Sequence, residues 1–121
     1  MSKKNILYVQ TSGVNTPERL YSPLILAQTA KAMEIEAAIY FLGMAITVMK
    51  HGEAEKIKVG NFPDLKQVLD QTMAAGVEFY ICEASCQLIG LNRGDFIPEA
   101  RIVGAATLND LVLEADGTMW F

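Results

Sequence analysis

The sequence predicts an α/β fold, a three-layer α/β/α sandwich with a mainly parallel sheet of about five strands. Short apolar runs alternate with segments of helical periodicity, and tight connections join them. One of these runs, residues 35–42, is apolar on both faces, as a strand covered by helices on each side is. With 121 residues, 51% of them hydrophobic, the chain is expected to form a single domain over residues 1–121.

The first strand is expected over residues 4–10, followed by a loop, QTSGVNTPER, and a helix that begins at Thr16 and Pro17. Proline at the first helical position gives up only a donor that has no partner within the helix. Residues 35–42, IEAAIYFL, predict a second, parallel strand that ends before Gly43. MAITVMK is expected to form a short helix, and the polar HGEAEKIKVGN a solvated loop or lid.

The second half of the chain repeats this alternation. FPDLKQVLDQTMAAG predicts a helix that closes at Gly76, a suitable C-terminal cap. VEFYIC is expected to be the third strand, EASCQLIG a short helix closed by Gly90, and ARIVGA the fourth strand. TLNDLVLEA predicts the fourth helix. GTMWF predicts a final edge strand near a subunit contact, because a large apolar end needs cover.

Charge and hydropathy exclude several classes of partner. The formal charge is −4, with 10 Lys and Arg against 14 Asp and Glu, so nucleic-acid and membrane-surface binding are disfavoured because phosphate contacts need clustered cations. The longest apolar run, residues 37–49, is shorter than the roughly 18 residues of a spanning helix, and the opening segment is interrupted before signal-peptide length. We expect a soluble, cytoplasmic protein whose two cysteines are free thiols.

Both cysteines lie where the third strand is expected to meet the short helix after it. In parallel α/β sheets, ligands bind just beyond the carboxyl ends of strands, and Cys82 occupies that place. Unpaired amides at a helix start favour an anion, so they would stabilise a thiolate or the extra sulfur of a persulfide. The neighbouring Glu83 opposes this, so a nearby cation is needed. The candidate cations are His51, Lys50 and Arg93.

Cys86 follows Cys82 at a spacing of four, which on a continuous helix places the two sulfurs about one turn apart on one face. The sulfurs could therefore communicate, with Cys86 resolving a species on Cys82 by forming a disulfide. The spacing differs from the C-x-x-C of thioredoxin-like oxidoreductases. The alternative is that both cysteines are small buried hydrophobes.

Other candidate residues follow the first two strands. Thr11, Ser12 and Gly13 lie at the expected carboxyl end of the first strand and could line the cysteine pocket, although the loop lacks P-loop and dinucleotide-binding patterns and is otherwise structural. His51, the lone histidine, is a further candidate, with a solvated loop residue as the alternative. No metal-type spacing is present, so neither a metal nor a cofactor is expected.

The pattern C-x-x-S-x-x-x-x-G, formed by Cys82, Ser85 and Gly90, resembles the cysteine segment of the DsrE/DsrF-like sulfur-relay family. Gly76 before the cysteine strand is similar to the family's helix-glycine-strand approach. The ending IVGAATLNDLVLEADGTMWF also resembles the family, and AIYFLGMAI matches more loosely. The resemblance thus covers nearly the whole chain.

The resemblance implies an α/β sandwich that assembles into homotrimers or homohexamers. It also implies that Cys82 accepts a sulfane sulfur as a persulfide and hands it to a thiol of another protein. Ser85 stands where some members have a second cysteine, Cys86 has no firm counterpart, and Ile89 replaces an arginine found in many members.

We therefore expect an intracellular sulfur-transfer protein that carries sulfur on Cys82 as a persulfide or thiosulfonate. Its expected partners are sulfur donor and acceptor proteins and further copies of itself. The residues expected to contribute to substrate binding are Thr11, Ser12, Gly13, Ser85 and His51. The alternatives are a non-catalytic oligomeric binding module for a small ligand or protein partner, and a thiol peroxidase.

Overall fold

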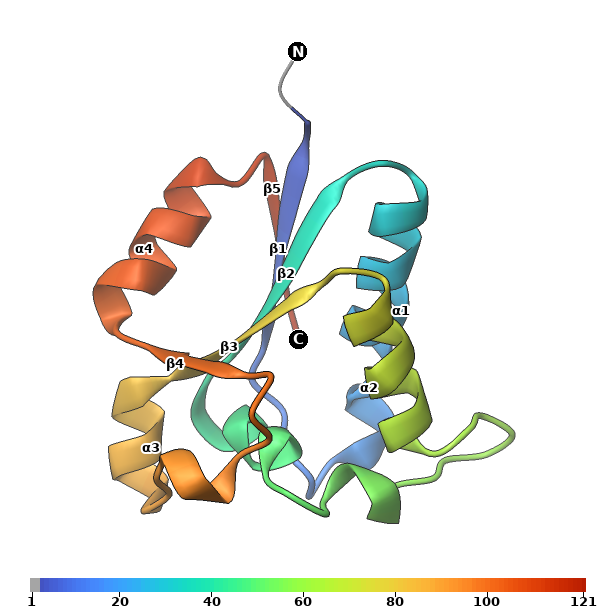
Figure 1. Ribbon diagram of the computed structural model, residues 1–121, viewed down its shortest axis with the longest axis vertical. Helices are drawn as coiled ribbons and strands as arrows, with labels where there is room; N and C mark the ends of the chain where they lie inside the picture. Colours follow the sequence, from blue (N-terminus) through green and yellow to red (C-terminus); the bar gives the residue numbers. More distant parts are fainter. Residues whose placement is uncertain (1–2) are drawn as a thin grey trace.

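The computed structural model describes residues 3–121, which form a five-stranded sheet of order β4-β3-β2-β1-β5. The strands are β1 (Asn5–Gln10), β2 (Glu36–Phe41), β3 (Glu78–Cys82), β4 (Arg101–Val103) and β5 (Gly117–Trp120). The α-helices are α1 (Tyr21–Ala32), α2 (Leu65–Ala74), α3 (Glu83–Ile89) and α4 (Ala105–Glu114). Helices α1 and α2 cover one face of the sheet and α4 the other (Figure 1), which confirms the predicted three-layer α/β/α sandwich.

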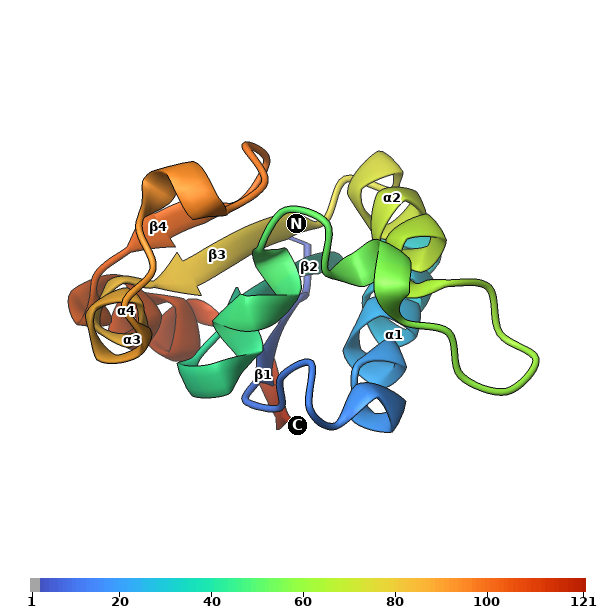
Figure 2. The same ribbon diagram turned by 90° about the horizontal axis from the view of Figure 1, so that it is seen from below.

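All neighbouring strands pair in parallel. Their carboxyl ends therefore meet at one edge of the sheet, the edge at which ligands bind in this class of fold. Helix α3 lies at this edge together with η2 (Gly43–Met49), a 3-10 segment seen in green in Figure 2. The sequence predicted a short helix after the second strand, and η2 is that helix in 3-10 form.

Two helix ends illustrate how local sequence sets these boundaries. Helix α2 begins after Asp64, whose carboxylate accepts a hydrogen bond from the amide of Gln67 at 2.9 Å. Helix α3 ends before Gly90, which adopts the left-handed conformation (φ 84°) that a side chain disfavours. The predicted cap at Gly90 is therefore confirmed.

The segment predicted as a solvated loop or lid is partly built into the fold. It contains a 3-10 turn, η3 (Ala54–Lys56), and both Ala54 and Ile57 are buried. Their side chains belong to the same apolar cluster as α1 and α2. Ala54 and Ile57 are spaced as on a helix, but two apolar residues within a charged segment are too few to establish a buried face.

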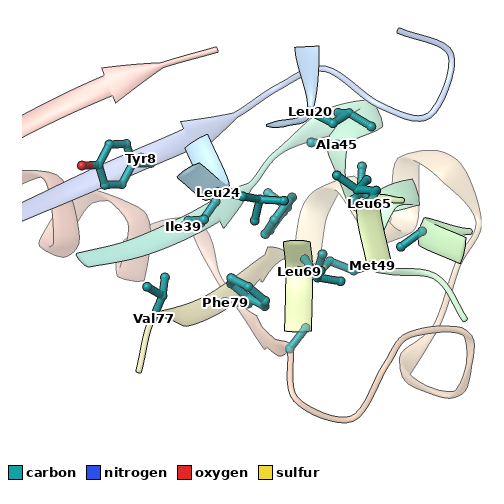
Figure 3. Close-up of a cluster of buried hydrophobic side chains, with 14 of the residues drawn as sticks. Tyr8, Leu20, Leu24, Ile39, Ala45, Met49, Leu65, Leu69, Val77 and Phe79 are labelled. Carbon is teal, nitrogen blue, oxygen red and sulfur yellow. The ribbon is translucent and has the colours of Figure 1, made fainter. Parts of the chain in front are cut away.

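The two faces of the sheet carry separate apolar clusters. The larger one lies under α1 and α2 and includes Leu24, Ile39, Leu69 and Phe79 (Figure 3). The smaller one lies on the α4 face. Its buried members are Leu7, Val9, Tyr40, Tyr80 and Cys82. Side chains alternate along a strand, so β3 sends Phe79 and Ile81 to the first cluster and Tyr80 and Cys82 to the second.

The α4 face is the less covered side of the molecule. No residue of α4 is fully buried, and Leu113 and Trp120 are 83% and 54% exposed. The terminal strand β5 lies at the sheet edge, as predicted. Its expected cover by a neighbouring subunit stays a prediction. Within residues 3–121, no helix is both long and apolar enough to cross a membrane.

Candidate functional site

Cys82 ends β3 and caps the N-terminus of α3. Its backbone is extended (φ −70°, ψ 119°), and its Sγ accepts a hydrogen bond from the backbone amide of Ser85 at 3.4 Å. This amide is one of the donors that a helix start leaves without a partner in the helix. The predicted strand-to-helix junction thus places the Cys82 sulfur against a backbone donor.

Ser85 connects this junction to the end of β2. The residue is buried, and its Oγ accepts a hydrogen bond from the amide of Gly43 at 2.7 Å. Gly43 is the first residue of η2. The contact therefore holds α3 against η2 and fixes the serine hydroxyl and amide beside Cys82.

Tyr40 on β2 packs in the same buried cluster as Cys82. It lies opposite Tyr80 in the sheet register, and the two rings stack with centroids 6.5 Å apart. The tyrosine is completely buried, and its hydroxyl has no hydrogen bond of ordinary geometry within residues 3–121. Its ring and Cys82 belong to the same buried cluster, and its hydroxyl contributes to lowering the pKa of the Cys82 thiol.

Opposing effects set the pKa of the Cys82 thiol. Burial raises it, because an anion loses solvation in an apolar environment. Hydrogen bonds to the thiolate lower it, first from the hydroxyl and amide of Ser85, then from the hydroxyl of Tyr40 and the amide of Ala84. The hydrogen bonds outweigh burial, and the pKa lies below that of an ordinary thiol.

Cys86 differs from Cys82 in both packing and electrostatics. It is buried in the cluster under α1 and α2, whereas Cys82 belongs to the cluster on the α4 face. Burial raises the pKa of the Cys86 thiol, and the negative charges of Cys82 and Glu83 raise it further. The two cysteines do not lie on one continuous helix, because Cys82 is an extended cap that precedes the first residue of α3. Both cysteines are free.

The loop after β1 lies at the same sheet edge but makes other contacts. The amide and hydroxyl of Thr11 both donate to the carbonyl of Phe121, at 2.6 and 2.5 Å. The amide of Ser12 donates to Oε1 of Gln10 at 2.8 Å. Gly13 packs against η2 so closely that a Cβ would lie 2.3 Å from the carbonyl oxygen of Met44.

The three candidate cations serve other contacts or face solvent. His51 is exposed, and its amide donates to the carbonyl of Asp95. Lys50 is half-buried and pairs with Phe96 through its backbone, and the Arg93 guanidinium donates to the carbonyls of Ala100 and Ile97. The hydrogen bonds that lower the pKa of Cys82 come from neutral donors instead.

Cys82 is buried, with 6% of the residue exposed. Five hollows on the described surface have volumes of about 210 to 380 Å³, and Cys82 lines none of these five. One of them is a mainly apolar groove of about 380 Å³ on α4 and β5. Its lining residues are Leu108, Asn109, Val112, Leu113 and Trp120.

Tyr40 is the residue of this site that sequence reasoning missed. A tyrosine within IEAAIYFL reads as one more large side chain of a strand covered on both faces. The available signal was its phenolic hydroxyl, since a buried polar group needs a partner and every other side chain of that run except Glu36 is apolar.

A family model described as DsrE/DsrF-like matches residues 4–121 of the chain. The chain belongs to the DsrE/DsrF-like family. This family is associated with sulfur relay. The match covers nearly the whole sequence, as the resemblance of the cysteine segment implied.

A curated relative is similar to the chain over most of the length of this chain. Over 102 residues the chain is 26% identical to the uncharacterized protein MJ0760 of Methanocaldococcus jannaschii, an alignment that covers 84% of this chain. The DsrE/DsrF-like chain spans only 37% of the length of that relative.

Solved structures confirm the fold. The ychN protein of E. coli superposes with a TM-score of 0.79 at 20% identity, covering 99% of this chain and all of the other. MTH1491 of Methanobacterium thermoautotrophicum, described as of unknown function, superposes with a TM-score of 0.70 at 11% identity and the same coverage. At these identities the similarity establishes the shared architecture alone.

Proposed function

We propose that this DsrE/DsrF-like chain is a sulfur-transfer protein that carries a sulfane sulfur on Cys82, as a persulfide or a thiosulfonate, and passes it to a partner thiol. The observation that carries the proposal is the position of the Cys82 sulfur at the carboxyl edge of the sheet, held by the amide of Ser85 at 3.4 Å. The lowered pKa of Cys82 supports it, because the thiolate is the form that attacks sulfur.

The chemistry requires two displacements at sulfur. In loading, the Cys82 thiolate attacks the outer sulfur of a donor persulfide, the donor S–S bond breaks, and the donor leaves as a thiolate. In delivery, the acceptor thiolate attacks the outer sulfur now bound to Cys82, and Cys82 leaves as a thiolate. Neither step changes the total oxidation state of the sulfur atoms, so no oxidant or reductant is needed. The donors that stabilise the Cys82 thiolate assist its departure in the second step.

The contrast between the two cysteines favours Cys82 as the carrier. The raised pKa of the Cys86 thiol keeps it protonated at a pH where Cys82 is partly ionised. Its place in the other apolar cluster also separates its surroundings from those of Cys82. Sulfur donor and acceptor proteins, and a cytoplasmic location where free thiols persist, belong to the same proposal.

Mass spectrometry after incubation with polysulfide tests the proposal. We expect the wild type to gain the mass of an added sulfur atom, and Cys82→Ser to gain none. The Cys86→Ala variant is the matched control and should load as the wild type does. No Lys or Arg lies between Lys66 and Arg93, so trypsin leaves both cysteines on one peptide and the single-cysteine variants are needed for assignment. Loading that persists in Cys82→Ser would exclude this carrier.

The exposed apolar groove on α4 and β5 favours a second role, that of an oligomeric binding module. Leu113 is 83% exposed, and Trp120 at the groove is 54% exposed. Large apolar patches of this kind mark contact surfaces in soluble proteins. We infer that further copies of the chain cover this face, giving a homotrimer or homohexamer, a role compatible with sulfur transfer.

Sedimentation analysis tests this self-association. The wild type is expected to sediment as a multiple of the 13.3 kDa chain, and Leu113→Asp to shift toward the single chain, because a carboxylate in an apolar contact loses its solvation. Leu88→Asp is the matched control, since Leu88 is equally exposed, at 81%, but lies on α3. A wild type that sediments as one chain would contradict the inference.

A further inference from the structure

We infer that Tyr40 serves the sulfur chemistry directly, its buried hydroxyl donating a hydrogen bond to the Cys82 sulfur whenever that atom is a thiolate. The inference rests on the proposed function and deepens it by adding a residue to the same site. It concerns two moments of the reaction, when Cys82 attacks a donor persulfide and when Cys82 leaves during delivery.

The first support is a hydroxyl that the fold does not explain. Tyr40 is 0% exposed, and its oxygen is the buried side-chain polar atom that lacks an ordinary hydrogen bond in residues 3–121. An unpaired buried hydroxyl is costly, and phenylalanine would fill the same space without that cost. The ring alone accounts for the stacking on Tyr80. The hydroxyl therefore requires a reason beyond packing.

The second support is the register of the sheet. Tyr40 lies opposite Tyr80 on the neighbouring strand, and Cys82 lies two residues beyond Tyr80 on the same face of β3. Side chains alternate along a strand, so Tyr40 and Cys82 lie on the same face of the sheet and share one buried cluster, near the carboxyl edge where Cys82 ends β3.

The third support is the protonation state of Tyr40. Burial raises the pKa of its hydroxyl, and the neighbouring Cys82 thiolate raises it further. The phenol therefore stays protonated near neutral pH and acts as a donor, not as a base that removes the thiol proton. The other titratable groups near this pair are Cys86 and Glu83 on α3, and Tyr80 and Glu78 on β3 with Arg101 on β4.

The test compares the alkylation rate of Cys82 as a function of pH in a Cys86→Ala background, with iodoacetamide as the probe. Tyr40→Phe is expected to move the midpoint of the profile upward by about one unit, since a hydrogen bond to a charged group is lost. Tyr80→Phe is the matched control. It removes the hydroxyl of the stacked ring, which is bonded to Glu78, and should leave the midpoint unchanged.

Thermal unfolding of the same variants separates this role from a structural one. Tyr40→Phe is expected to melt at the same temperature as its parent or a few degrees higher, because it removes a buried unpaired hydroxyl. A profile midpoint that Tyr40→Phe leaves unmoved would overturn the inference, as would a clear loss of stability with no change in midpoint.

This test and the loading experiment can fail independently, because alkylation needs no sulfur donor. A shifted midpoint in a protein that never loads sulfur would refute sulfur transfer and leave the Tyr40 hydrogen bond in place. Normal loading with an unmoved midpoint would refute the role of Tyr40 alone. Slower delivery of loaded sulfur by Tyr40→Phe to a small thiol, with Tyr80→Phe unaffected, would support both.

Discussion

Gly13→Ala is expected to lower the free energy of unfolding by about 3 kcal/mol, the upper end for forcing extra volume into a packed site. The new Cβ would lie 2.3 Å from the carbonyl oxygen of Met44 and 2.9 Å from Oγ1 of Thr47. The Met44 oxygen belongs to the backbone of η2, so the clash is relieved only by moving the loop or η2. The melting temperature should fall by about 10 °C, measured by circular dichroism.

A movement of η2 should also disturb the candidate site. Gly43, the first residue of η2, donates the hydrogen bond that holds Ser85. Gly117→Ala is the matched control, because a Cβ there meets no atom within 4 Å in the described structure. Equal melting temperatures for Gly13→Ala and Gly117→Ala would show that the loop after β1 does not pack against η2 in this way.

Ser85→Ala is expected to weaken both the fold and the thiolate. Loss of the Ser85 hydroxyl leaves the amide of Gly43 without its acceptor at 2.7 Å. An unpaired buried donor lowers the free energy of unfolding by about 1–3 kcal/mol. The serine hydroxyl also lowers the pKa of Cys82, so the alkylation profile of Cys82 should move to higher pH. Denaturant unfolding and iodoacetamide alkylation measure the two effects separately.

Ser22→Ala provides a control for Ser85→Ala, since it removes an exposed serine hydroxyl from α1. It should change neither the free energy of unfolding nor the alkylation profile. A Ser85→Ala variant with wild-type stability and an unmoved profile would contradict the connection between β2, α3 and the Cys82 sulfur.

The fold was predictable because local patterns and tertiary environment agree. The run at residues 4–10 is short and apolar, and the run at 35–42 is apolar on both faces, as a strand covered on each side is. Gly90 marked the end of α3 because its left-handed backbone conformation excludes most side chains. The same logic placed Cys82 at the carboxyl edge, since the apolar run that ends there is β3.

The site was only partly predictable, because its decisive contacts join different strands. The position of Cys82 followed from its own strand, but the approach of Tyr40 depends on the register between β2 and β3. The place of Cys86 in a separate cluster depends on Cys82 being an extended cap instead of a helical residue. Beside the backbone amides expected at the helix start, the neutral hydroxyls of Ser85 and Tyr40 lower the pKa of the Cys82 thiol, where a cation was expected.

The alkylation profile of Cys82 in the otherwise wild-type Cys86→Ala protein tests the central claim most directly. The claim is that the folded chain holds this sulfur as a reachable thiolate. Comparison of folded and urea-unfolded protein gives the sign of the pKa shift of Cys82. A depressed pKa ionises the folded thiol at lower pH than the unfolded one. We expect the folded midpoint to lie below the unfolded one. A folded midpoint at or above the unfolded one, or no alkylation until the chain unfolds, would contradict the account.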